Sequence, residues 1–266
     1  MDVDDSWAVA ESAFAAFLRE NPAVERALLD SPLESLNGAD AYLRAAVLEE
    51  RGEEAAAAHR AADEKCYSAE VRAARDGALE RVVELAERRD GLLVDVATGR
   101  GGLLTRLLAG SSRPLVATDV SPHVLRATER RLPGPRYVVA DACSLPFGDG
   151  EAATLVTHVG LANVPGGRRL LRELRRVGQE LIATHVFYPT DDEVNRAAAR
   201  ELGLEELLVR DTALPAFASE GWEVAVEYER EVKAEPTPSS ALVPGVGIDS
   251  LPIQTTQTTW CVLRAT

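Results

Sequence analysis

Three aspartates follow short apolar runs in the middle of the chain, and the first of them introduces a glycine-rich turn. Asp95 leads into residues 96–102, which contain three glycines. Asp119 ends the next apolar run, twenty residues after Gly99, and Asp141 ends the third run. Glycines let the backbone approach a ligand closely, and a carboxylate at this position can accept two hydrogen bonds from a ribose diol. Together these residues fit a nucleoside that carries a positive charge.

A phosphate-bearing cofactor fits the same turn less well. The dinucleotide fingerprint G-x-G-x-x-G requires a glycine where the chain has Leu104, and a P-loop requires Lys and Ser or Thr after the glycines. Asp95 would also bring a like charge towards a pyrophosphate. An NAD(P)-linked oxidoreductase is therefore the alternative enzyme, although Leu104 and Asp95 argue against that function.

Residues 95–101 resemble motif I of the class I S-adenosylmethionine (SAM) dependent methyltransferases, whose common form is D-x-G-x-G-x-G. Gly99 and Gly101 match the second and third glycines, and Ala97 stands in place of the first. The resemblance implies SAM as the cofactor, a Rossmann-like fold, and in-line transfer of a methyl group to a small-molecule acceptor. A SAM-binding or scaffold protein without catalysis is the second alternative.

The resemblance also implies a role for each acid. Asp95 would face the SAM ammonium, directly or through water, and the backbone of Gly99 would lie against the methionine part. Asp119 would hold the ribose hydroxyls, Asp141 the adenine amino group, and the Ala142 amide a ring nitrogen. The residues expected to bind the cofactor are Tyr67, Asp95, Ala97, Thr98, Gly99, Gly101, Asp119, Val120, Asp141, Ala142 and His158.

Two histidines at expected strand ends are the candidate catalytic residues. His158 and His185 could each act as a base, because the charge of histidine changes near neutral pH. The alternative is that each ring bonds a neighbouring backbone group. Asn163 and Tyr188, on the loops that follow, are candidates for binding the substrate. Residues 160–165 also resemble the G-L-x-N-V stretch of quinone-biosynthesis C-methyltransferases.

Strands and helices alternate between residues 91 and 188, which predicts a doubly wound, mostly parallel sheet covered on both faces. Two later segments, 222–235 and 255–266, alternate with a period of two and are expected to form an antiparallel edge pair. The fold expected is thus a seven-stranded sheet with an antiparallel last strand. The five earlier strands are expected within 92–96, 114–120, 136–142, 151–160 and 180–188.

The first part of the chain shows helical periodicity, and we expect it to form a domain separate from the rest. Residues 1–66 are expected to be a helical extension, acting as a lid or a dimer surface, and 67–266 the SAM-binding domain. An apolar stripe in 7–18 predicts a first helix, and a turn is expected at Asn21-Pro22. The loop at 235–253 is expected to shape the acceptor pocket.

Net charge and cysteine content limit the classes of partner and ligand that we expect. Acidic residues outnumber Lys and Arg 43 to 29, a net charge of −14, which repels nucleic acids and anionic membranes at long range. Five arginines in 168–176 are therefore interpreted as a solvated helix face. The three cysteines form no C-x-x-C pair, so no metal site is expected. We expect a cytoplasmic protein with a small-molecule substrate, and the helical extension offers a surface for a homodimer.

Overall fold

The computed structural model describes residues 20–36, 38–48, 52–236 and 251–266. The chain divides into two compact units: one takes residues 1–70 and 234–255, and the other 71–233 and 256–266. The helix expected within 7–18 lies outside the described residues, as do positions 237–250 of the loop expected at 235–253. Across the part of the chain that is described, no helix is long and apolar enough to cross a bilayer.

The smaller unit is helical, as its periodicity predicts. Its elements are α2 (Pro22–Asp30), the 3-10 turn η2 (Leu33–Ser35), α3 (Gly38–Val47) and α4 (Gly52–Cys66). Leu36, Ala41 and Ala62 form a small apolar core, and Lys65 Nζ donates to the Leu33 carbonyl at 3.1 Å. The turn expected at Asn21-Pro22 is the start of α2, because proline fits the first turn of a helix, where its missing N–H has no partner to lose.

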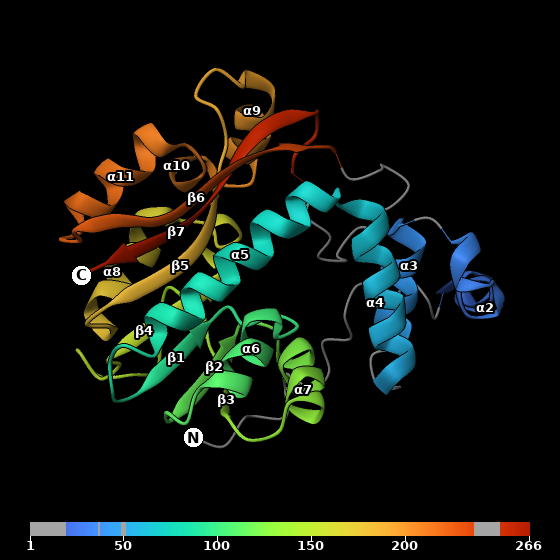
Figure 1. Ribbon diagram of the computed structural model, residues 1–266, viewed down its shortest axis with the longest axis horizontal. Helices are drawn as coiled ribbons and strands as arrows, with labels where there is room; N and C mark the ends of the chain where they lie inside the picture. The colour runs from blue at the N-terminus through green and yellow to red at the C-terminus, as the bar shows by residue number, and fades with distance from the viewer. Residues whose placement is uncertain (1–19, 37, 49–51, 237–250) are drawn as a thin grey trace. The chain divides into compact units, whose positions relative to one another are not determined.

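The larger unit is built on one seven-stranded sheet, which confirms the predicted fold (Figure 1). The strand order is β3-β2-β1-β4-β5-β7-β6, with β1 to β5 parallel and β7 antiparallel to β5. The strands are β1 (Leu93–Val96), β2 (Leu115–Asp119), β3 (Arg136–Val139), β4 (Thr154–His158), β5 (Leu181–Phe187), β6 (Val224–Ala234) and β7 (Thr256–Ala265).

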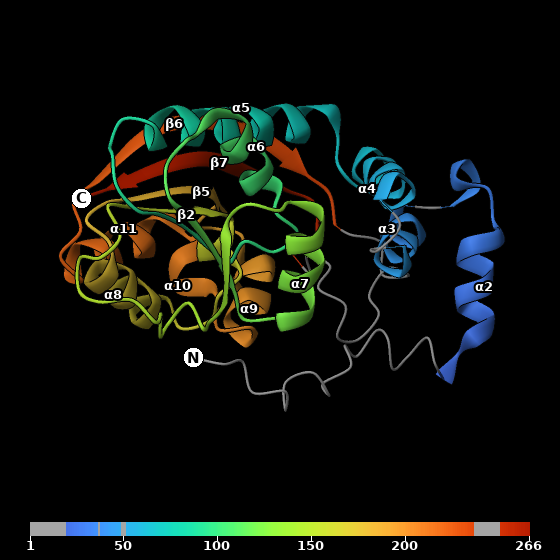
Figure 2. The ribbon, with the colours of Figure 1, turned by 90° about the horizontal axis from the view of Figure 1, so that it is seen from below.

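Helices cover both faces of this sheet (Figure 2). Leu93, Val156 and Ile182 face α5 (Ala69–Ala86) and α6 (Gly102–Gly110). Val94 and Ala183 point the other way, towards the core shared with α8 and α11, because successive side chains of a strand alternate between faces. The other helices of this unit are α7 (Pro122–Arg131), α8 (Gly167–Val177), α9 (Glu193–Glu201), α10 (Glu205–Leu208) and α11 (Arg210–Ser219).

The last two alternating segments form a pair at one edge of the sheet, as expected, and they are β6 and β7. β7 does not lie at the edge: it inserts between β5 and β6, and β6 is the outer strand. Glu223 and Thr266 exchange both backbone hydrogen bonds at 3.0 Å, at one end of the β6–β7 pair. Most of β7 is buried and most of β6 is not, which is the physical reason for this order.

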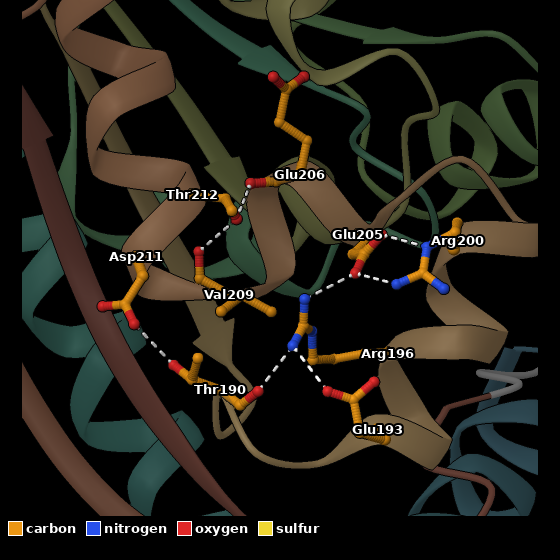
Figure 3. A network of polar contacts seen from close by, with 9 residues as sticks. All are labelled: Thr190, Glu193, Arg196, Arg200, Glu205, Glu206, Val209, Asp211 and Thr212. Carbon is orange, nitrogen blue, oxygen red and sulfur yellow. Dashed lines mark hydrogen bonds and ion pairs between the residues drawn. The ribbon is translucent and has the colours of Figure 1, made fainter.

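An ion-pair network fixes the connection between β5 and α11 (Figure 3). Glu205 accepts from Arg196 at 3.0 Å and from Arg200 at 2.7 Å. Arg196 also donates to the Thr190 carbonyl at 2.7 Å, and the Thr190 hydroxyl donates to Asp211 at 2.9 Å. These contacts join α9, α10 and the start of α11 into one support beside the end of β5.

Candidate functional site

The three predicted aspartates lie at one edge of the sheet. Asp95 is in β1, Asp119 ends β2, and Asp141 follows β3 by two residues. The three strands are neighbours and parallel, so their carboxyl ends meet at the same rim. The backbone ties two of the ends together, since Ala140 N donates to the Asp119 carbonyl at 2.9 Å. The structure therefore brings together the acids that the sequence singled out.

The glycine-rich turn folds back onto this rim. Thr98 N donates to the Thr118 carbonyl at 2.8 Å, and Gly99 N donates to Asp119 Oδ2 at the same distance. The Thr98 hydroxyl donates to the Asp95 carbonyl at 3.0 Å, and this hydrogen bond holds the turn against the end of β1. Gly101 ends the turn as the N-cap of α6. The carboxylate at the end of β2 thus fixes the position of the loop.

The two glycines of the motif are needed for different reasons. A Cβ atom on Gly99 would meet nothing within 4 Å, so this backbone borders open space. A Cβ atom on Gly101 would come within 2.8 Å of a methyl carbon of Leu132 and 3.0 Å of Thr128 Cγ2. Gly101 therefore lets α7 pack closely against the turn, and Gly99 leaves room for a ligand.

Ala97, which replaces the first glycine of the motif, adopts a left-handed conformation with φ of 55°. This region costs a residue with a Cβ atom about 1–2 kcal/mol. We expect Ala97→Gly to raise the free energy of unfolding by about 1 kcal/mol, or roughly 2–4 °C in Tm. Ala73→Gly, on an exposed position of α5, is the matched control and should lower stability by about 1 kcal/mol. A destabilised Ala97→Gly variant in thermal unfolding would contradict this prediction.

Asp95 is the electrostatic outlier of the rim. Its side chain is 1% exposed, and neither carboxylate oxygen has a hydrogen-bond partner among the described residues. Burial raises the pKa of this carboxyl from 3.8 to about 7, because the charged form loses its hydration. A buried carboxylate is costly unless it is paired. The site therefore favours a cationic group beside Asp95.

Asp119 and Asp141 retain capacity to bind a ligand. Asp119 accepts from Gly99 N and, at 2.9 Å, from Ser121 N. Asp141 accepts from Cys143 N at 2.8 Å and from Arg169 Nη2 at 3.1 Å. Each carboxylate has about four acceptor positions, so two remain on each side chain.

The two residues that follow these acids differ in exposure. Val120, directly after β2, is 66% exposed, which is unusual for a large apolar side chain. Ala142, after Asp141, is buried. An exposed valine next to the acid expected to bind ribose offers an apolar surface for a flat ring.

The two candidate histidines lie on opposite faces of the sheet. His158 pairs with Thr184 in the β4–β5 register, so His158 shares the α5–α6 face with Asp95 and Val156. His185, one residue further along β5, points to the other face. The choice of face is thus set by the register of β4 against β5.

Each histidine has its own environment. His158 Nδ1 lies 2.6 Å from Thr184 Oγ1. Burial, with the charges of Arg75 and Arg106, lowers the pKa of His158 to about 4. His185 is 1% exposed, and its Nε2 donates to the Leu207 carbonyl at 2.7 Å. Burial lowers the pKa of His185 to about 4 as well. Both rings are therefore neutral at pH 7.

The remaining predicted residues lie on loops. Asn163 Nδ2 donates to the Val159 carbonyl at 3.1 Å, in the turn after β4. Tyr188 follows β5, and its N–H donates to the Leu208 carbonyl at 2.8 Å. Tyr67 lies between α4 and α5 and belongs to the smaller unit.

Thr184 and Trp260 contact His158 but were not among the residues predicted from the sequence. Thr184 bonds the His158 ring, and Trp260 of β7 has its ring centroid 6.3 Å from that of His158. A polar residue in the middle of a buried apolar strand was a signal for Thr184. Trp260 had none, because its place depends on β7 lying next to β5.

The arginines of α8 form the solvated helix face that the sequence predicts. Each has a partner within the larger unit. The pairs are Arg168–Glu206, Arg169–Asp141, Arg172–Glu220 and Arg176–Glu173, and Arg175 lies over the ring of Trp222. Among the described residues, no group of three or more His, Cys, Asp or Glu side chains could hold a metal ion.

Part of the chain that forms this site matches a known protein family. The methyltransferase domain family matches residues 94–180, which hold the turn, all three acids and His158. Over these residues the chain is similar to a methyltransferase domain. The match covers the cofactor rim and stops before β5.

Curated relatives resemble about the same share of the chain. Demethylmenaquinone methyltransferase of Thermotoga maritima is 39% identical over 101 residues, which are 37% of this chain and 44% of that protein. Ubiquinone/menaquinone biosynthesis C-methyltransferase UbiE of Acidiphilium cryptum is 33% identical over 104 residues, 37% of this chain and 42% of that protein. The chain thus spans less than half the length of these relatives.

Solved structures share the fold of the methyltransferase domain. YcgJ of Bacillus subtilis superposes with a TM-score of 0.52 at 13% identity, covering 71% of this chain and 96% of that protein. The [4+2]-cyclase SpnF superposes with a TM-score of 0.51 at 18% identity, covering 71% and 79%. At these identities the likeness concerns the fold alone.

Proposed function

We propose that this chain transfers a methyl group from SAM to a small organic acceptor. One observation carries the proposal: a buried carboxylate without a partner, that of Asp95, lies at the rim beside an open glycine turn. SAM carries an ammonium and a sulfonium, and it would supply the missing cation. A phosphorylated cofactor would instead add a second negative charge next to Asp95.

The rim residues fit SAM from end to end. Asp95 would hold the ammonium, and the Gly99 backbone would border the methionine chain. Asp119, its loop-facing lone pairs already used, would accept the ribose hydroxyls with the remaining ones. Asp141 would accept from the adenine amino group, and the exposed Val120 would pack against the adenine ring.

The remaining binding residues follow from their place in the turn. Ala97, Thr98 and Gly101 would shape the loop, and the Ala142 amide would serve an adenine ring nitrogen. Tyr67 stays a predicted cofactor residue, on the evidence of its sequence position.

Bound SAM would supply an activated methyl group on a cationic sulfur. The protein has to align the acceptor with that methyl group and exclude water, and alignment alone can contribute about 7–11 kcal/mol to lowering the barrier. His158 lies on the same face of the sheet as Asp95: Asp95 pairs with Val156 of β4, and His158 is two residues further along that strand. We therefore assign His158 to the acceptor end of the site. His185 is the weaker candidate, since its Nε2 is used by Leu207. Asn163 and Tyr188 remain candidates for orienting the acceptor.

Two other functions compete with this proposal. An NAD(P)-linked oxidoreductase would need a glycine at 104, where Leu104 is fully buried in α6. A protein that binds SAM without methyl transfer would use the same rim, and the likeness to a [4+2]-cyclase illustrates that this fold also serves other chemistry. Only a transfer assay separates the second alternative from our proposal.

The predicted setting follows from the same reasoning. The relatives are named for methylation of demethylmenaquinone or for ubiquinone and menaquinone biosynthesis, and from them we take the acceptor class, a small organic molecule. The homodimer, the cytoplasmic location, the absence of nucleic-acid and membrane partners, and a domain boundary at residues 66 and 67 remain predictions.

Calorimetry on the folded full-length chain tests the proposal. We expect SAM and its demethylated product to bind and NAD(P) not to bind. Transfer of a labelled methyl group from SAM into the small-molecule fraction of a cell extract should follow. No heat at millimolar SAM would defeat the proposal, and SAM binding without label transfer would favour the non-catalytic alternative.

A further inference from the structure

The hydroxyl of Thr184 lies between the His158 ring and the turn that follows β4. Thr184 Oγ1 is 2.6 Å from His158 Nδ1 and 3.1 Å from Val159 N. The Thr184 side chain is fully buried, at 0% exposure, so water cannot replace either contact. The proton of this hydroxyl must therefore go to a protein group.

Counting donors and acceptors determines where that proton goes. A threonine hydroxyl has one proton and two lone pairs. The N–H of Val159 can only donate; it lies 3.1 Å from both the Thr184 carbonyl and Thr184 Oγ1, and so occupies one lone pair of Oγ1. If His158 Nδ1–H also donated, the hydroxyl proton would have no acceptor among the described residues, since His158 is its only other recorded partner. A buried donor without a partner makes that arrangement about tenfold or more less populated.

The turn next to this contact is strained. Val159 has φ of 58°, a left-handed conformation that a β-branched residue rarely adopts. It is held by its own N–H on Thr184 and by Ala162 N, which donates to the Val159 carbonyl at 3.0 Å. Strained residues of this kind persist where the surroundings fix them, and they cluster at functional sites.

We propose that Thr184 is a positioning residue: its hydroxyl donates to His158 Nδ1 and so fixes the tautomer with the proton on Nε2. His158 then presents an N–H donor to the methyl acceptor, and it does not act as the base that the sequence suggested. The lowered pKa of His158 keeps the ring neutral at pH 7. Nε2 has no partner among the described residues of the larger unit, so it is available to a ligand.

This role narrows the acceptor class, and that step depends on the proposed function. An N–H donor at the acceptor end suits a molecule with a carbonyl, phenolate or enolate oxygen next to the atom that is methylated. The ring of Trp260, tilted 31° from the His158 plane at 6.3 Å, adds a flat apolar neighbour. Such a molecule would place its oxygen on Nε2.

Nitrogen-15 NMR of the histidine side chains tests the tautomer directly. The chain has four histidines, and His158→Gln identifies the signal of His158. In the full-length protein without SAM, we expect the Nε2–H form in about tenfold excess or more. Thr184→Ser, which keeps the hydroxyl, should preserve that excess. Thr184→Val, which has the same shape without the hydroxyl, should reduce it to threefold or less.

The outcomes separate the two proposals. A proton on Nδ1 in the unsubstituted protein would overturn the inference, whether or not Thr184→Val folds. Equal tautomer ratios in the Ser and Val variants would also overturn it, since the hydroxyl would then have no influence. Because the readout needs neither SAM nor an acceptor, failure of SAM binding in calorimetry would count against the proposed function alone.

Discussion

Asp95→Asn is expected to abolish measurable SAM binding and at the same time to stabilise the folded protein. The carboxylate is buried and has no hydrogen-bond partner in the part of the chain that the structure describes. It is therefore costly in the free protein and becomes favourable when the ammonium of SAM pairs with it. Removing one partner of a buried ion pair costs about 3–5 kcal/mol, which is a loss of a hundredfold or more in affinity. Asparagine has nearly the same shape and carries no charge.

The pH dependence of stability follows from the raised pKa of Asp95. The folded-state pKa is about 7 and the ordinary value is 3.8, so the folded protein binds the extra proton between these limits. The contribution of Asp95 to stability is therefore lost as pH rises from about 4 to 7, by up to about 4 kcal/mol. Asp95→Asn lacks this loss, so its advantage over the unsubstituted protein should be small at pH 4.5 and largest at pH 8.

Two measurements check both parts. Urea unfolding at pH 4.5 and 8 should show the stability difference growing with pH. Calorimetry should show SAM binding more tightly as pH rises through 7, because the ammonium pairs with the ionised carboxylate. A stability difference that is constant with pH, or unchanged SAM affinity in Asp95→Asn, would show that Asp95 is not the buried partner of the cofactor.

Asp119→Ala is expected to weaken SAM binding by a hundredfold or more. The variant loses two charge-assisted hydrogen bonds to the ribose diol, each worth about 1.5–3 kcal/mol. It also releases Gly99 N and Ser121 N, so the glycine turn is no longer tied to the end of β2. For this second reason we expect a loss of about 1–3 kcal/mol in the free energy of unfolding.

Calorimetry and urea unfolding measure these two effects separately. Asp149→Ala is a control of the same charge change, because Asp149 is exposed and, among the described residues, forms an ion pair with Arg176 of α8 alone. Its SAM affinity should stay within twofold of the unsubstituted protein. If Asp119→Ala binds SAM as well as the control does, the ribose assignment is wrong.

The cofactor rim could be predicted from sequence because its determinants are local. Gly99, Gly101 and Asp119 come together because only the turn, α6 and the short strand β2 connect them, so their sequence spacing already indicates their proximity. Ser121 and Pro122 predict the start of α7, and the Ser121 hydroxyl does accept from Val124 N at 3.3 Å. Continuous apolar runs predict buried parallel strands because both faces of such a sheet are covered.

The acceptor end depended on pairing between strands far apart in the chain. His158 and His185 look equivalent in sequence, since both are expected at strand ends. His158 does end β4, but β5 continues to Phe187, beyond His185. The strand register pairs His158 with Thr184, so His185, the next residue of β5, points to the opposite face of the sheet from His158. One residue along a strand reverses the direction of the side chain. The insertion of β7 beside β5, which brings Trp260 to His158, depends likewise on which strand buries more apolar surface.

What the sequence determined by itself is therefore the order of strands and helices through β5 and the group of acids around the glycine turn. The tertiary structure decided that Asp95 lacks a partner and that Thr184 bonds His158. Hydrogen-bond partners and burial come from residues far apart in the chain, and composition and periodicity carry no record of them.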